Sequence, residues 1–566
     1  MTRSIIDPIT RIEGHLRVEM EVEGGVVTDA WVSGGCFRGM ELVVEHRTPE
    51  DAAQIVQRIC GVCPVSHSHS STIAGEKAYG ITISNNARLI RNMIEGAQFL
   101  HSHILWLYNL CALDYVNPLH ALEANPDDAM ALAKQLGTST NSNFEALQER
   151  LKKFAANGQL SIFSGNWFDA DGGDAYKLPA AGDLLLTSHY LEALTMQSKA
   201  SEIAGLLGGK MPHVMTIIPG GTAFVPTAEK LDDLLFLIRE LKDWVEGTVL
   251  QDTVALATYY PDVFKFGKGV GRYIAWGVFE GPDWPYGNDY TAQMANRYMP
   301  SGVVNDDLSL EDPIENNITE YVGHSWYQGG QTFTAPYFTT QPNFTEYYEK
   351  DSVGADGIGK VAEKYTWVKC PQYKDMPYEA GGLSRVLAAY LRGVPFVVEQ
   401  ANALMKTAGI GIPELQSTLG RSAVRQIETV YIANLMEQWC LELIEAIKGG
   451  DSEFFKEPLT KTGSGTGFWE APRGALYHSE KVTNGLIDGY HIIIPSTWNL
   501  APHNERGEYG PLEQALIGVP VETIEKPINA LRTVHSFDPC TACAVHVTEP
   551  KTGKTFETVT SPWGVK

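Results

Sequence analysis

Apolar residues recur at two spacings along this chain, and each spacing predicts a different kind of element. Between residues 15 and 33 apolar and polar residues alternate, which is the period of a β-strand with one buried face. Gly24-Gly25 interrupts the alternation and supplies a turn, so we expect a β-hairpin. One face of its first strand carries four apolar side chains: Leu16, Val18, Met20 and Val22.

Farther along the chain, apolar residues return at every third or fourth position, which is the period of an α-helix. Several long helices of this kind predict a central bundle. The segments with this pattern, or with the composition of a helix, are residues 86–116, 183–207, 227–250, 380–408 and 418–448.

We therefore expect a mainly α protein with an α+β periphery, folded as one compact body. Residues 1–85 form a β-rich N-terminal region, and residues 86–258 supply the first part of the bundle. Residues 259–379 are rich in Gly, Tyr, Trp, Pro and Asn, which predicts an insertion of loops and short strands. Residues 380–546 are expected to return to helices. No repeat or linker divides the chain, and 566 residues can bury a large core.

The net charge of the chain argues against one class of binding partner, nucleic acid. The chain has 44 Lys and Arg against 68 Asp and Glu, a formal charge of −24, which would repel the phosphates of nucleic acid. We expect no nucleic acid partner, and the acidic surface is adequately explained by solubility. No apolar run is long enough to span a bilayer, and the first residues have no apolar segment of the kind found in secretory signals.

The eight cysteines are too few for a disulfide scaffold in a chain of this length, but four of them form two Cys-x-x-Cys pairs. The pairs are Cys60 with Cys63 and Cys540 with Cys543. A gap of two residues lets both thiolates of a pair face one metal ion. Nearly the whole chain separates the pairs, which disfavours a local zinc knuckle. A zinc site closed by the fold, an iron–sulfur cluster, nickel with iron, or a disulfide role all stay open from spacing alone.

The sequence around these pairs is more specific, because it resembles the large subunit of nickel–iron hydrogenases along the whole chain. Seven segments match the family's patterns in the family's order. They are Asp7-Pro-Ile-Thr-Arg-Ile-Glu-Gly-His15, Phe37-Arg-Gly-Met-Glu41, Arg58-Ile-Cys-Gly-Val-Cys63, Glu470-Ala-Pro-Arg-Gly474, Pro495-Ser-Thr-Trp-Asn499, Arg532-Thr-Val-His-Ser-Phe537 and Asp538-Pro-Cys-Thr-Ala-Cys-Ala-Val-His546.

The resemblance implies an enzyme that splits H2 heterolytically and reversibly at a nickel–iron centre. Cys60 and Cys540 would be terminal ligands of nickel, and Cys63 and Cys543 would bridge nickel to an iron that carries CO and cyanide. Soft thiolates suit both metals. The thiolate of Cys540 would be the first base for the proton, and Glu13 matches the family's proton-gate glutamate.

The same resemblance gives roles to residues around the metals. Arg473, beside Pro472, would overhang the open side of the centre and bind a cyanide nitrogen, with Asp538 holding it in place. Ser496 would donate a hydrogen bond to the other cyanide. His67 would hydrogen-bond toward a bridging thiolate. Plain core packing is the alternative for two residues that would wall the CO pocket, Leu476 and Ile494.

A further cation, magnesium or iron, is implied near the C-terminal motif. Its ligands would be Glu41, His546 and the backbone carbonyl of Ile492, with waters. Family large subunits commonly carry a short extension after the last histidine. A maturation protease removes it once nickel-insertion proteins have loaded the metal, and residues 547–566 look like such an extension.

The sequence also departs from the family and leaves some cysteines unassigned. Ser102 stands between two histidines where many members have an acidic residue, so the surroundings of Arg473 are expected to differ. The cysteines outside the pairs read as packed thiols: Cys36, Cys111, Cys370 and Cys440.

These remaining cysteines do not form a pattern for iron–sulfur clusters, so electrons must leave through a partner. The resemblance implies an iron–sulfur small subunit in a large interface. It favours a periplasmic or membrane-associated enzyme, exported through the partner's twin-arginine signal, with a cytoplasmic location left open. The rival readings are an H2-sensing subunit, a non-catalytic hydrogenase-like subunit and a zinc-stabilised structural protein. The four cysteines, Glu13 and Arg473 argue against the non-catalytic subunit, and the extension argues against the sensor. Metal analysis of the purified protein would separate the zinc-stabilised protein from the enzyme.

Overall fold

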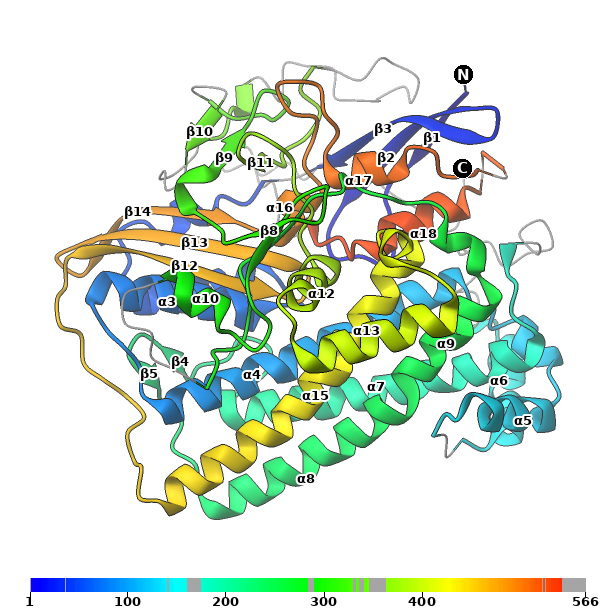
Figure 1. Ribbon diagram of the computed structural model, residues 1–566, viewed down its shortest axis with the longest axis horizontal. Helices are drawn as coiled ribbons and strands as arrows, with labels where there is room; N and C mark the ends of the chain where they lie inside the picture. Colours follow the sequence, from blue (N-terminus) through cyan, green and yellow to red (C-terminus); the bar gives the residue numbers. More distant parts are fainter. Residues whose placement is uncertain are drawn as a thin grey trace.

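Four long helices lie side by side and pack against one another: α4 (Asn85–Ile104), α7 (Ala180–Gly208), α8 (Ala228–Trp244) and α15 (Thr418–Lys448). Figure 1 shows them in the lower half of the molecule, with the sheets above. The structure is a computed structural model. It describes residues 2–35, 37–139, 142–159, 175–282, 290–328, 332–334, 341–345, 363–521, 523–524 and 526–541.

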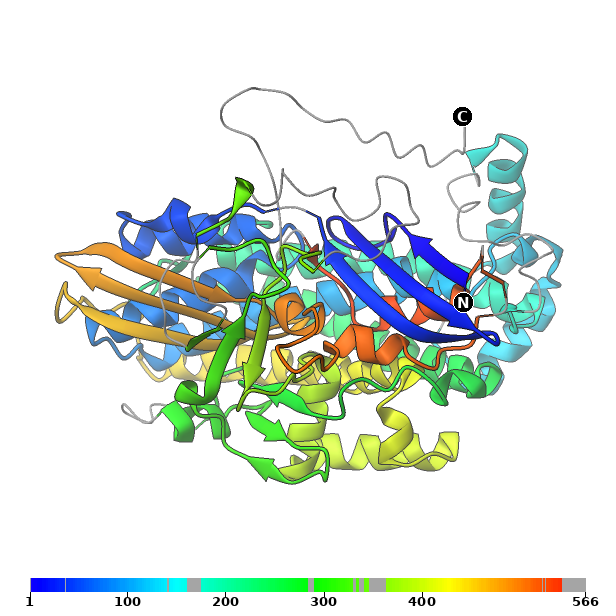
Figure 2. The same ribbon diagram turned by 90° about the horizontal axis from the view of Figure 1, so that it is seen from above.

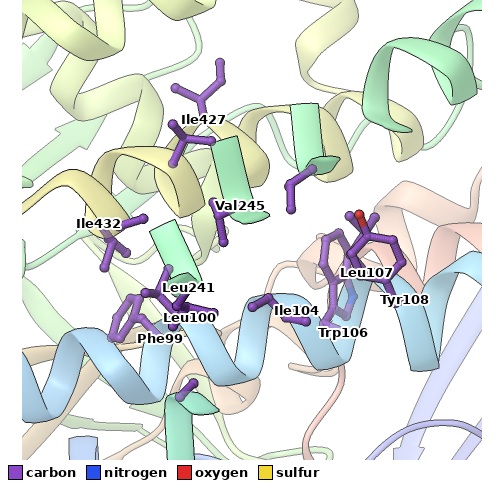
Figure 3. Close-up of a cluster of buried hydrophobic side chains, with 14 of the residues drawn as sticks. Phe99, Leu100, Ile104, Trp106, Leu107, Tyr108, Leu241, Val245, Ile427 and Ile432 are labelled. Carbon is purple, nitrogen blue, oxygen red and sulfur yellow. The ribbon is translucent and has the colours of Figure 1, made fainter. Parts of the chain in front are cut away.

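Two of the predicted helical segments contain a π-helical turn. α4 continues into η2 (Leu105–Cys111), and α8 continues through η7 (Val245–Val249) into α9 (Leu250–Tyr259). Figure 3 shows what these turns achieve. Trp106 and Val245, one from each turn, point into the same apolar cluster as Ile427 of α15, so the turns help to fill the core between the long helices.

The segment 380–408 folds as two helices, α12 (Gly382–Leu391) and α13 (Pro395–Ala408), because the chain turns between them. Gly393 has a φ of 77°, a conformation that glycine adopts without strain, and Pro395 occupies the first turn of α13, where it fits a helix start. The remaining helices are α1 (Met40–Val44), α2 (Pro49–Ile55), α3 (Pro64–Tyr79), α5 (Pro126–Leu136), α6 (Phe144–Ala156), α10 (Tyr290–Ala295), α14 (Ile412–Leu415), α16 (Pro495–Asn499), α17 (Pro511–Leu516) and α18 (Ile528–Ser536).

The predicted N-terminal hairpin is confirmed, and a third strand extends it. β1 (Thr2–Ile6), β2 (Leu16–Glu23) and β3 (Val26–Gly34) form an antiparallel sheet in the order β1-β2-β3. Gly24 and Gly25 join β2 to β3 with φ of 62° and 81°, the sign that a two-residue hairpin turn requires at both positions.

A second antiparallel sheet lies directly on α3, the helix that follows the first cysteine pair. It contains β12 (Gly463–Ala471), β13 (Gly474–Thr483) and β14 (Leu486–Ile493). Gly463, Gly465 and Gly467 alternate along β12, and a Cβ atom on any of them would clash with a backbone carbonyl of α3. This glycine row lets the strand backbone touch the helix backbone, which fixes the position of α3 against the sheet.

The remaining strands of the described residues are short and form three further small sheets. They are β4 (Ile217–Ile218), β5 (Gly221–Thr222), β6 (Tyr273–Ala275), β7 (Gly302–Val304), β8 (Leu310–Glu311), β9 (Ile318–Tyr321), β10 (Thr332–Thr334) and β11 (Cys370–Tyr373). Figure 2 shows the β12–β14 sheet (orange) at the left of the body and the N-terminal sheet (blue) at the right. About half of the described chain is helical, and none of its helices combines the length and apolar character needed to cross a bilayer.

Candidate metal centre

Three of the four paired cysteines meet at one buried point between the sheets and α3. The sulfur atoms of Cys60, Cys63 and Cys540 all lie within 4.8 Å of one another, and those of Cys60 and Cys540 are 3.4 Å apart. Cys60 and Cys540 are 480 positions apart in the sequence, so the fold brings the first pair and Cys540 of the second pair together. Cys543, His546 and residues 547–566 lie outside the described residues, as does Cys36.

The first pair sits in a turn that is shaped to hold thiolates. Cys60 follows the 3-10 turn η1 (Val56–Ile59), and the backbone N–H groups of Val62 and Cys63 donate to its sulfur at 3.3 and 3.0 Å. Cys63 is the residue at which α3 begins, with Pro64 in the first turn. Backbone donors and the positive end of a helix both favour the charged form of a thiol, which is the form that binds metals.

Glu13 reaches the second pair through its backbone and its side chain. The thiol of Cys540 donates to Oε2 of Glu13 at 3.2 Å, and the backbones of the two residues form a parallel bridge. Thr541 N–H donates to the Glu13 carbonyl at 2.7 Å. The same loop is anchored farther back, since His535 lies 2.8 Å from the Thr10 carbonyl oxygen. The carboxylate is therefore held against the sulfur and is only partly buried.

Arg473 occupies the tight turn between β12 and β13, next to Pro472, and is fully buried. Its Nη2 donates to Oδ1 of Asp538 at 2.9 Å and its Nε donates to the Asp538 carbonyl at 3.1 Å. Burial opposes the charged form of Arg473, but Asp538 and the nearby cysteine sulfurs outweigh it and hold the pKa well above its usual range. The predicted Arg473–Asp538 pair is present, and the second oxygen of Asp538 binds Arg425, which the sequence did not single out.

Ser496, Leu476 and Ile494 also lie at the centre. The Ser496 hydroxyl accepts a hydrogen bond from the backbone N–H of Cys540 at 3.1 Å, which places its oxygen beside the second pair. Leu476 and Ile494 belong to the same buried apolar cluster as the three described cysteines. An apolar wall of this kind excludes water from the sulfurs.

His67 lies one turn after Cys63 on α3 and is buried. Its Nδ1 is 3.2 Å from Nε2 of His478, whose Nδ1 is 2.8 Å from the Tyr490 hydroxyl, which in turn donates to Ser71. Burial, with the charge of Arg38, lowers the pKa of His67 to about 4, so the ring is neutral at pH 7. Its Nε2 atom is buried without a partner among the described residues. Sequence reasoning missed His478 and Tyr490, which come from β13 and β14.

Glu41, which the sequence predicted as a cation ligand, forms a hydrogen bond and ion pairs with neighbouring protein groups. Its Oε1 accepts from the backbone N–H of Ile492 at 3.0 Å and lies 3.1 Å from Nδ1 of His491 and 3.6 Å from Nζ of Lys369. Burial opposes ionisation, but Lys369, His491 and Ile492 lower the pKa of Glu41 to about 2. Glu320 completes the group, 3.0 Å from Nε2 of His491. Among described residues, only the three cysteines gather enough acidic, Cys or His donors to hold an ion alone.

Ser102 and three cysteines outside the two pairs are buried in the structure. The Ser102 hydroxyl is buried under the first cysteine pair and donates to the Val62 carbonyl at 3.4 Å. Three further cysteines are buried, as predicted for packed thiols: Cys111, Cys370 and Cys440.

The donors present fit a nickel–iron centre. Three soft sulfur atoms converge, which suits nickel and iron better than magnesium or calcium. Two buried polar atoms, Nη1 of Arg473 and Nε2 of His67, have no partner among the described residues, so both can serve a group bound at this point.

Comparison with known proteins agrees with this geometry. The family model described as nickel-dependent hydrogenase matches residues 38–546, and a model described as HoxL-like matches residues 4–33. The chain is 37% identical to the Hydrogenase-2 large chain of Escherichia coli (strain K12) over 97% of both chains. It is 34% identical to the uptake hydrogenase large subunit of Rhodobacter capsulatus over 96% of this chain and 95% of that one.

Solved structures give the same answer for the fold. The structure of an H2-activated NiFeSe hydrogenase from Dm. baculatum superposes with a TM-score of 0.76 at 34% identity, covering 96% of this chain and 100% of that one. The reduced NiFeSe hydrogenase of D. vulgaris Hildenborough gives a TM-score of 0.77 at 32% identity, with 96% and 100% covered. This chain belongs to the nickel-dependent hydrogenase family, as one of its large subunits.

Proposed function

We propose that this chain is the catalytic subunit of a nickel–iron hydrogenase that converts H2 reversibly into protons and electrons. The observation that carries the proposal is the convergence of Cys60, Cys63 and Cys540 at a buried point where Glu13 contacts the Cys540 sulfur. A zinc-stabilised structural site would have no use for a carboxylate held against one of its sulfurs.

Cys60 and Cys540 would hold nickel as terminal ligands, while Cys63 and Cys543 would bridge nickel to iron. When bound, the nickel–iron group supplies the polarising centre at which H2 is split. The sulfur of Cys540 would be the first acceptor for the proton, because the carboxylate of Glu13 lies beside it. Glu13 takes the proton from that sulfur across a contact of 3.2 Å and releases it toward the surface.

The residues around the cysteine sulfurs would bind the ligands of the iron and hold them in place. Arg473 is fixed by two hydrogen bonds to Asp538. Its Nη1 would donate to a cyanide nitrogen, and its positive charge would lie over the bound metals. Ser496 would donate to the second cyanide, and Pro472 would shape the turn that carries Arg473. Leu476 and Ile494 would line the side where CO is bound and exclude water there.

His67 would hydrogen-bond toward a bridging sulfur through Nε2, while the contact of its Nδ1 with His478 orients the ring. At the second cation, Glu41 would bind magnesium or iron with His546 and the carbonyl of Ile492. Lys369, His491 and Glu320 surround Glu41, so they would hold its carboxylate and the cation's waters in place.

Electrons need an exit, and the chain is therefore expected to work with an iron–sulfur small subunit. Hydrogenase large subunits generally pair with such a partner, and the described cysteines outside the centre are isolated and buried. The location of the complex would follow the partner, and we favour a periplasmic or membrane-associated enzyme.

The test is to purify the chain with its partner, measure nickel and iron, and record the infrared spectrum. Nickel together with CO and cyanide bands, and H2-dependent dye reduction, are the expected results. Bands without turnover would favour an H2-sensing or non-catalytic subunit instead. Zinc alone, with no nickel and no such bands, would refute the proposal.

A further inference from the structure

Asp538 lies between two buried arginines that come from different parts of the chain. Oδ1 accepts from Arg473 Nη2 at 2.9 Å, and Oδ2 accepts from Arg425 Nη2 at 2.8 Å. Arg473 comes from the β12–β13 turn, whereas Arg425 comes from the N-terminal part of α15. All three side chains are at least 95% buried. One carboxylate therefore binds two guanidinium groups, and its single negative charge compensates only one of their positive charges.

The other neighbours of Arg425 supply no second negative charge. Its guanidinium carbon lies 4.4 Å from the ring centre of Trp106, and its Nε is buried without a partner among the described residues. Thr429 hydrogen-bonds to the Arg425 carbonyl and lies 3.0 Å from Nδ1 of His103, a ring that burial and nearby arginines keep neutral. The group Arg425, Arg473 and Asp538 thus carries one excess positive charge.

A neighbouring arginine in the same core shows the opposite balance. Arg385 donates to Glu428 at 2.5 and 2.8 Å and to Glu470 at 2.8 Å, so two carboxylates surround one buried cation. Arg385 therefore gives Arg425 a matched comparison of the same residue type, in the same core, with the reverse ratio of charges.

An uncompensated cation in the interior is unfavourable, because burial removes the water that stabilises it. Burial, with the charges of Arg473 and Arg385, lowers the pKa of Arg425. Beside the carboxylates that Arg385 binds, the cysteine sulfurs of the metal centre are negative groups in this core, and they act on Arg473. Metal-bound thiolates and cyanides would add negative charge at that place.

We propose that Arg425 is a positioning residue of the metal centre. Arg425 fixes Oδ2 of Asp538, so that Oδ1 and the backbone carbonyl of Asp538 hold Arg473 over the sulfurs. The anionic centre, once loaded, would help to balance the charge of Arg425. The proposal rests on the metal centre proposed above. If this is right, Arg425 stabilises the loaded enzyme and destabilises the chain that lacks the metals.

The experiment compares Arg425→Met with Arg385→Met in two states: the full chain produced without nickel, and the loaded enzyme with its partner. Arg425→Met leaves a balanced Arg473–Asp538 pair, so the Tm of the empty chain should stay the same or rise. Arg385→Met leaves two buried carboxylates without their cation, so the Tm of the empty chain should fall.

In the loaded enzyme, Arg425→Met should lower nickel retention or H2 oxidation by about tenfold, as is usual when a group supporting a metal ligand shell is removed. The CO and cyanide bands should move, because Arg473 is no longer held by a doubly fixed carboxylate. Arg425→Lys, which keeps the charge and can still donate to Asp538, should recover part of the loss.

Two results would overturn the proposal. A fall in the Tm of the empty Arg425→Met chain as large as that of Arg385→Met would make Arg425 an ordinary structural residue. Unchanged bands and turnover in loaded Arg425→Met would remove its role at the centre. Failure of the metal centre itself is seen separately, as absence of nickel and of CO and cyanide bands in the unmodified enzyme.

Discussion

Glu13 and Cys540 are joined twice, through a 3.2 Å contact between the thiol and the carboxylate and through a parallel bridge between their backbones. The backbone bridge matters because it fixes the distance without relying on the side chains. A proton leaving the sulfur finds an acceptor whose position is set by the fold. The pair therefore links the metal centre to the N-terminal loop by geometry that survives changes of protonation.

Glu13→Gln should stop proton transfer while leaving the metal centre in place. Glutamine keeps the size and the hydrogen bonding of glutamate but cannot accept a proton, so turnover should fall by at least ~100-fold. The measurement is H2-dependent dye reduction, together with nickel content and infrared spectra. The metal content and the bands should match those of the unmodified enzyme.

Glu13→Asp is the matched control, since it keeps the acid and shortens the reach. It should retain more activity than Glu13→Gln. Equal and nearly full activity in both variants would show that protons leave the Cys540 sulfur by another route.

Cys60→Ser should abolish nickel binding, because a hydroxyl is a harder and weaker ligand for nickel than a thiolate. Nickel per chain, measured on the purified complex, should drop to background. Cys440→Ala is the control. Cys440 is also fully buried, but burial raises its pKa to about 12 and it lies on α15, away from the centre. Loss of nickel from both variants alike would mean that general misfolding, and not ligation, explains the result.

Gly467→Ala should damage the support of the first cysteine pair. The added methyl group would clash with the Ser70 carbonyl of α3, and either β12 or α3 must move. We expect destabilisation of at least ~1–3 kcal/mol in thermal unfolding, with reduced nickel content. Ser464→Ala, at an exposed position of the same strand, should change the stability by less than ~0.5 kcal/mol. Equal unfolding temperatures for the two variants would contradict the backbone contact described here.

Glu480→Gln should make stability less dependent on pH. Glu480 is fully buried, with no hydrogen-bond partner for either carboxylate oxygen among the described residues. Burial, together with Glu50, raises its pKa from 4.5 to about 8. A raised folded-state pKa contributes stability below 4.5 that is lost as the pH rises to 8, by roughly 1.4 kcal/mol per pH unit.

The check is to follow the Tm of both proteins from pH 5 to pH 8. Glu480→Gln should gain on the unmodified protein as the pH rises. Glu95, whose pKa burial also raises to about 8, titrates in both proteins and cancels in the comparison. Parallel profiles across this range would show that the Glu480 carboxyl is not protonated in the folded protein.

Local patterns predicted the elements that depend on neighbours in sequence. The β-hairpin at Gly24-Gly25 and the helix at 418–448 follow from spacing and turn residues, and the structure has both. The break at Gly393 and Pro395 interrupts a longer stretch with helical composition, so the sequence predicts one helix there where the structure has two. The β12–β14 sheet was not foreseen, because its glycine row looks like a loop unless the helix beneath it is known.

Some residues of the candidate site could likewise be predicted from the sequence, and others could not. The ligands and Glu13 could be named because they stand in short motifs. Arg425, His478 and Lys369 could not, since each belongs to an element with no motif of its own and reaches the site only through the tertiary fold. Charge balance around Asp538 is a property of three distant segments, and no single stretch of sequence contains it.

The distance of 480 positions between Cys60 and Cys540 also sets a delay. At a synthesis rate of roughly 5–20 residues per second, Cys540 leaves the ribosome roughly 24 to 96 s after Cys60. During that interval the first pair has neither its sulfur partners nor Glu13's contact to complete the pocket. A metal ion captured then would meet only half a ligand set, so faithful loading must wait for the chain's last segment. Assembly of this centre is therefore a matter of timing as well as of chemistry.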